Sequence, residues 1–87
     1  MKKLYIIILG PETDKDLLST RIKELGDSYA FWDRHFLLSS EITSSTNLYN
    51  RLVGDDGDKQ IVVFALNDNP EYWGYANKGL WTWLKER

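Results

Sequence analysis

Two short apolar runs constrain the fold of this chain more than any other feature of its sequence. The first run, at 4–9, reads Leu-Tyr-Ile-Ile-Ile-Leu and stops at Gly10 and Pro11; the second, at 61–66, reads Ile-Val-Val-Phe-Ala-Leu. Each run is too short to span a bilayer, and each has the composition of a strand buried on both faces. We therefore expect both runs to lie in one sheet that the rest of the chain covers.

The length of 87 residues predicts a single domain, 1–87, with a small core. A domain of this size buries only about 60–65% of the surface that its unfolded chain exposes. The chain has no cysteine, so disulfides and thiolate metal sites cannot supplement that core. We expect no cofactor and no metal, and association of two copies is the remaining common source of stability.

The charge and the N-terminal residues bear on partners and location. With 11 basic and 13 acidic residues, the formal charge is −2, whereas nucleic-acid-binding domains usually carry a basic stripe. Lys2 and Lys3 imitate the start of a signal peptide, but the apolar run is too short and lacks a small-residue cleavage site. We expect a cytoplasmic protein without a membrane segment, and the lack of cysteine agrees with that compartment.

Residue periodicity places four strands and three helices along the chain. The strands are expected at 3–9, 28–32, 35–39 and 60–66, with a tight hairpin turn at Asp33 and Arg34. The first helix is expected at 14–25 with Thr13 as N-cap, and Thr43 is expected to cap a second helix that ends before the Gly-Asp loop at 54–58. A short terminal helix is expected at 79–85, and the stretch 71–77 is left unassigned.

This order predicts an α+β fold, a ferredoxin-like βαββαβ sandwich with an added C-terminal helix. The first two helices should cover one sheet face, with strands 3–9 and 35–39 central and strands 28–32 and 60–66 at the edges. The other face, which should receive Tyr5 or its neighbours, needs a cover, and a bare apolar edge invites aggregation. We expect both the Trp-rich C-terminal segment and a second copy to cover it, through Ile61, Val63, Phe64, Trp73 and Trp81.

Several features together resemble the small SinR-like protein family. They are the order of elements, the aromatic hairpin at 31–38, the Gly-Asp loop before the second apolar run, and the closing Trp-Leu-Lys at 83–85. This family is similar to the CRISPR spacer-acquisition subunit that bridges two integrase dimers and to VapD-type endoribonucleases. The resemblance implies a ferredoxin-like homodimer.

The resemblance also sets an expectation about catalysis. In the nuclease members a carboxylate at the end of strand one holds a divalent metal, but here Leu9, Gly10 and Pro11 occupy that position. Glu12 and Asp14 follow only in the turn and at the helix start. We therefore do not expect metal-dependent phosphodiester cleavage to carry over to this chain.

Three residues are the candidates if the chain is an enzyme after all: Asp14, Asp33 and His35. His35 is the single histidine and is a possible general base of a ribonuclease-like site. Because a turn is expected at 33–34, residues 33 and 35 need not share a side of the strand. We favour a packed or solvated histidine.

Two other clusters have simpler interpretations. The aspartates at 55, 56 and 58 imitate part of a calcium loop, but the residue twelve positions after the first is Leu66, so a solvated turn is favoured. A group of aromatic residues offers either base stacking or a lid on the open sheet face, and we favour the lid: Trp73, Tyr75, Trp81 and Trp83.

Two functions remain open from the sequence. The first is a non-enzymatic, homodimeric interaction module that associates with itself or with another protein. The alternative is a nucleic-acid-associated protein or a weak metal-dependent endoribonuclease, as the resemblance suggests.

Overall fold

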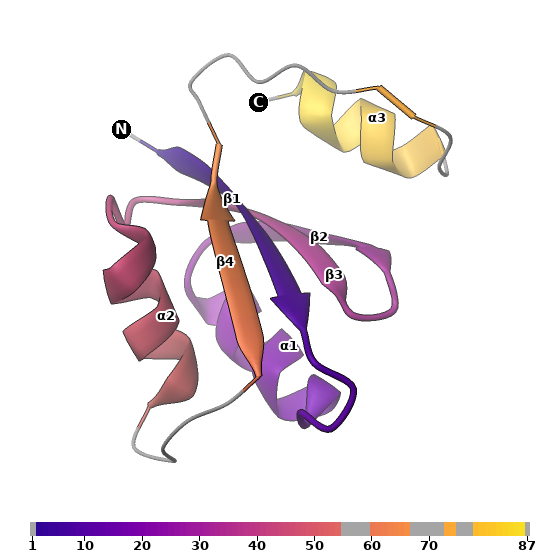
Figure 1. Cartoon of the computed structure of the whole chain (residues 1–87). Coiled ribbons are helices and arrows are strands. Elements are labelled where there is room, and N and C mark those ends of the chain that lie inside the picture. Colours follow the sequence, from indigo (N-terminus) through magenta and orange to yellow (C-terminus); the bar gives the residue numbers. More distant parts are fainter. Residues whose placement is uncertain (1, 55–59, 67–72, 75–77, 87) are drawn as a thin grey trace.

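The computed structural model describes residues 2–54, 60–66, 73–74 and 78–86, and these form an α+β fold (Figure 1). In the described residues a four-stranded antiparallel sheet is combined with three helices. The elements follow in the order β1 (Lys3–Leu9), α1 (Lys15–Glu24), β2 (Asp27–Trp32), β3 (His35–Ser40), α2 (Ser45–Val53), β4 (Ile61–Ala65) and α3 (Lys78–Lys85).

The strand order is β2-β3-β1-β4, so β1 and β3 are central and β2 and β4 form the edges. This confirms the predicted positions of the four strands in the sheet. The tight hairpin between β2 and β3 is also confirmed, with Trp32 opposite His35 and an irregular register between Ala30 and Trp32. On the other side of β1, Ile7 lies opposite Val63 of β4.

Helices α1 and α2 cover one face of the sheet. Alternate residues of β1 (Tyr5, Ile7 and Leu9) are buried against them, because successive strand side chains point to opposite faces. Tyr5 therefore belongs to this face, while its neighbour Ile6 lies on the other. The buried members of this main core are Tyr5, Ile7, Leu9, Leu18, Ile22, Phe36, Leu38, Leu48, Leu52, Val53 and Ile61.

Helix α3 covers part of the second face. Leu80 and Leu84 pack on Leu37 of β3, and α3 also contacts β2. The Tyr29 and Trp83 rings stack there with centroids 6.3 Å apart. The partly buried members of this second cluster are Leu4, Ile6, Tyr29, Phe31, Leu66, Trp81 and Trp83. Trp81 and Trp83 of α3 thus form a partial lid on this face, whereas Trp73, which the sequence assigned to the same lid, is fully exposed.

Both predicted helix caps are wrong by one residue. Asp14, rather than Thr13, caps α1, because its carboxylate accepts a hydrogen bond from the Leu17 N–H at 3.1 Å. The Thr13 hydroxyl instead donates to the Gly10 carbonyl at 2.8 Å and so stabilises the turn after β1. Similarly, Ser44 rather than Thr43 caps α2.

The side chain of Arg21 on α1 binds the end of α2. Arg21 Nη1 donates to the carbonyls of Leu52 and Val53, at 2.8 and 3.1 Å. The next residue, Gly54, has φ +64°, a conformation that L side chains rarely adopt, and it ends the helix. The positive charge of Arg21 thus lies at the C-terminal end of α2, which is the negative end of the helix dipole, and this arrangement is stabilising.

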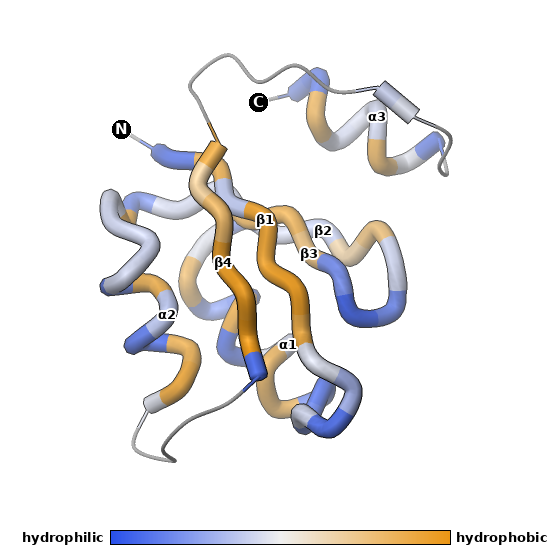
Figure 2. The backbone as a smooth tube through the Cα atoms, viewed as in Figure 1, coloured by the Kyte–Doolittle hydropathy of each residue, from blue (hydrophilic) through white to orange (hydrophobic). Residues whose placement is uncertain are grey.

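Hydrophobic residues run along most of β1 and β4 (Figure 2). No helix within the described ranges is long and apolar enough to cross a membrane. The aspartates of the calcium-loop alternative at 55–58 and Tyr75 lie outside the described residues.

Candidate functional site

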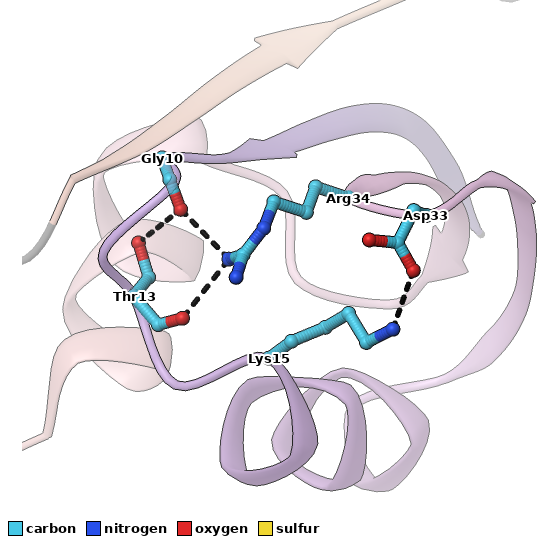
Figure 3. A network of polar contacts seen from close by, with 5 residues as sticks. All are labelled: Gly10, Thr13, Lys15, Asp33 and Arg34. Carbon is cyan, nitrogen blue, oxygen red and sulfur yellow. Dashed lines mark hydrogen bonds and ion pairs between the residues drawn. The ribbon is translucent and has the colours of Figure 1, made fainter.

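The turn after β1 is fixed by Arg34, the second residue of the hairpin turn (Figure 3). Its guanidinium Nη1 donates to the Gly10 carbonyl at 2.8 Å and to the Thr13 carbonyl at 2.9 Å. The Leu9 N–H in turn donates to the Arg34 carbonyl at 2.9 Å. Arg34 therefore acts as a structural clamp between the hairpin and the start of α1.

Asp33 is paired with Lys15 at the start of α1 (Figure 3). The Lys15 Nζ and Asp33 Oδ1 atoms lie 2.5 Å apart, and the Asp33 side chain is 76% exposed. The hydrogen bond from Lys15, followed by the lysine's positive charge, lowers the pKa of Asp33. Such a solvent-exposed pair contributes little to stability.

The other two candidate residues have different environments. The Asp14 carboxylate caps α1, as described above. His35 lies opposite Ile8, which places its side chain on the sheet face away from α1 and α2. There its ring centroid is 5.8 Å from Phe31 and 5.5 Å from Trp32, and its Nδ1 atom is buried without a hydrogen-bond partner in the described structure.

The structure therefore brings Asp14 and Asp33 to the start of α1 and leaves His35 on the opposite face of the sheet. Neither carboxylate orients the imidazole, and one carboxylate is bound to a helix N-terminus and the other to a lysine. Among the described residues no three His, Cys, Asp or Glu side chains are grouped to hold a metal ion.

The second candidate site is an apolar strip on β4. Val62 and Phe64 are 47% and 53% exposed. They lie opposite Ile8 and Ile6 of β1, so they share the sheet face on which α3 packs. Neither belongs to the cluster under α3. We call Ile8, Val62 and Phe64 the open strip, since α3 leaves it uncovered.

The outer edge of β4 has backbone groups that the sheet does not use. The Leu66 N–H donates to the Leu4 carbonyl at 2.8 Å, and the Gln60 carbonyl accepts from the Gly10 N–H at 2.6 Å. Because backbone groups alternate sides along a strand, those of residues 61, 63 and 65 point away from β1. Within the described residues no strand pairs with this edge.

The five residues named from sequence as an interface have different positions. Phe64 lies on the open strip, and Trp73 is 100% exposed. Trp81 packs at the margin of the cluster under α3. Ile61 and Val63 point into the main core, where their side chains stabilise the single chain. Val62, which the sequence reasoning missed, is indicated by its position two residues before Phe64 in the same strand.

Comparison of the chain with models of known protein families, with curated proteins and with solved structures finds no match in any of the three.

Proposed function

We propose that this chain is a ferredoxin-like interaction module, of the SinR-like kind, that pairs with a second copy of itself along β4 and catalyses no reaction. The element order, the strand order β2-β3-β1-β4 and the position of α1 and α2 on one face support this choice of fold.

The open strip is the observation that carries the proposal. An edge strand normally avoids edge-to-edge pairing through charge, proline, a bulge or a cover. The β4 sequence Ile-Val-Val-Phe-Ala has no charge and no proline, and its register with β1 is regular. The other edge strand, β2, has the irregular register between Ala30 and Trp32 and lies under α3.

Pairing with a second copy would give the outward backbone groups of β4 hydrogen-bond partners and would cover its exposed apolar side chains. Two antiparallel β4 strands related by a two-fold axis would join their outward backbone groups and form one continuous sheet. The same pairing brings Val62 and Phe64 of each copy beside their counterparts on one face. A two-fold contact uses the same surface on each copy, so it closes after two chains.

The pairing is tested by measuring the molar mass in solution, with light scattering after size exclusion, at protein concentrations from about 1 to 100 µM. This range covers dissociation constants of weak to moderate complexes. We expect a species of twice the 10.2 kDa chain mass. Phe64→Lys places a charge on the open strip and should give the monomer. Ala65→Pro should do the same, because it removes an outward N–H that the β1 ladder does not use.

Leu17→Lys is the matched control, because Leu17 is a large apolar side chain on α1 that is also exposed, at 37%. It should leave the mass unchanged. A wild-type monomer at the highest concentration would refute the pairing, as would a Phe64→Lys variant that remains folded and dimeric.

Catalysis is tested separately. Labelled RNA and DNA, incubated with the protein with and without Mg²⁺ or Mn²⁺, should stay intact. Cleavage that is lost in both His35→Ala and Asp33→Asn would overturn the proposal in favour of an endoribonuclease.

A further inference from the structure

A depression of about 340 Å³ lies between the first turns of α1 and the end of the β2–β3 hairpin. Lys15, Asp16 and Ser19 of α1 form one wall, Trp32 forms the other, and the buried Phe36 ring contributes apolar surface. Ligand pockets commonly start at about 300 Å³ and combine apolar surface with a few polar groups. It lies beside the β2 edge, whereas the proposed dimer contact uses β4.

The aromatic wall is large and available. Trp32 is 58% exposed, although an indole of this size usually buries most of its surface. The Phe31 and His35 rings lie with centroids 5.3 and 5.5 Å from that of Trp32, which holds the indole in position. An indole that is fixed in this way loses little conformational freedom when a ligand binds to it.

The charges around the pocket favour a cation. Two carboxylates, Asp16 and Asp33, and one ammonium, Lys15, line it, so its formal charge is negative. Lys15 binds Asp33 and shows that this carboxylate accepts a nitrogen cation. In the described part of the chain the Asp16 carboxylate has no hydrogen-bond or ion-pair partner, and the Ser19 hydroxyl adds a further acceptor at the same wall.

We propose that this pocket binds a planar organic cation, an alkylguanidinium group, stacked on Trp32 and paired with Asp16. A guanidinium stacks on aromatic faces and presents a fork of N–H donors to a carboxylate. A simple anion would meet a lining with a net negative charge, because Lys15 is already paired with Asp33, and a neutral aromatic ligand would gain no charge interaction with the exposed Asp16 carboxylate. The guanidinium group comes either from a free small molecule or from an arginine side chain.

Titration by ¹H–¹⁵N NMR with ethylguanidinium chloride tests the proposal. We expect saturable shifts of the Trp32 indole N–H and of the Asp16 and Ser19 amides. N-ethylurea, which has nearly the same shape but no charge, should produce none, and neither should sodium chloride at the same concentration. N-acetylarginine methylamide carries the same group on a peptide backbone, so tighter binding of this compound would identify an arginine side chain as the source.

Variants separate the pocket from the acidic surface. Trp32→Leu keeps an apolar side chain but should weaken binding about two- to fivefold, the size of an exposed cation–π contact. Asp16→Asn should also weaken it. Lys15→Met should strengthen binding by a similar factor, because it frees Asp33 from its internal cation. The matched controls are Trp73→Leu, at a fully exposed indole, and Glu24→Gln, at an exposed carboxylate outside the pocket.

The proposal is overturned if N-ethylurea gives the same shifts as ethylguanidinium. It is also overturned if the shifts rise linearly and spread over the surface carboxylates, or if Trp73→Leu weakens binding as much as Trp32→Leu. These outcomes do not depend on the mass of the protein in solution, so they are independent of the test of pairing through β4.

Discussion

Replacing Arg34 with methionine should destabilise the chain far more than its surface position suggests. Arg34→Met keeps most of the aliphatic stem but removes the guanidinium that binds the Gly10 and Thr13 carbonyls. The backbone contact between Leu9 and Arg34 is retained. The change therefore isolates the clamp that joins the hairpin turn to the start of α1.

The contacts set the expected size of the effect. A hydrogen bond to a charged group contributes about 1.5–3 kcal/mol, so two of them correspond to about 3–6 kcal/mol when fully buried. Arg34 is only half-buried, and water replaces part of the loss, so we expect the free energy of unfolding to fall by about 2–3 kcal/mol. For a domain of this size, each kcal/mol lowers Tm by about 4–8 °C.

Urea and thermal unfolding followed by far-UV circular dichroism measure this loss. Arg51→Met is the matched control, since Arg51 is an exposed arginine of α2, and its replacement should change stability by less than about 0.5 kcal/mol. If Arg34→Met loses no more than Arg51→Met does, the turn is not held by the guanidinium and the clamp is refuted.

Three further predictions concern single contacts. Asp14→Ala removes the α1 cap and should cost about 1 kcal/mol in urea unfolding, while Asp14→Asn should recover most of it; equal losses would exclude capping. Burial raises the pKa of Tyr5 above the ordinary tyrosine value of about 10. The stability that the neutral hydroxyl contributes is therefore fully present below about pH 10, and it is lost as the pH rises through the raised pKa of the folded protein. The difference in stability between wild type and Tyr5→Phe should therefore shrink at alkaline pH, and a constant difference would contradict this origin. Lys15→Met should raise the pKa of Asp33, measured by NMR titration of its carboxyl carbon, because the lysine is the main cause of its lowering; an unchanged pKa would show that the pair does not persist in solution.

The elements themselves could be predicted from sequence because each carries its own local signal. The strand β1 begins and ends where its apolar run predicts, and the hairpin turn lies at Asp33 and Arg34. The helix caps could not be placed to the residue. Thr13 precedes Asp14 and Thr43 precedes Ser44, so two capping residues adjoin in each case. At α1 the Thr13 hydroxyl bonds to the local Gly10 carbonyl and also to the Gln60 carbonyl, which is distant in sequence, and the second of these contacts is one that the sequence does not reveal.

The candidate sites depend on contacts that sequence patterns do not reveal. The pocket joins residues 15–19 of α1 to Trp32 and Phe36, and nothing local to either segment indicates the other. The sequence showed that 61–66 is apolar on both faces. The position of α3 decides which side chains of this run stay exposed. Because α3 packs toward β2, it leaves Val62 and Phe64 uncovered. His35 lies away from Asp14 because its place in the β3 register puts it on the opposite face.

The contact between Arg21 and the end of α2 has a consequence for how the molecule opens in its native state. The last carbonyls of α2 are held by a side chain of α1, so the final turn of α2 cannot fray without releasing its neighbour. Helix ends are normally the first backbone amides to exchange with deuterium, through small local fluctuations. Here the amides at the end of α2 should instead exchange together with those around Arg21, as one cooperative unit.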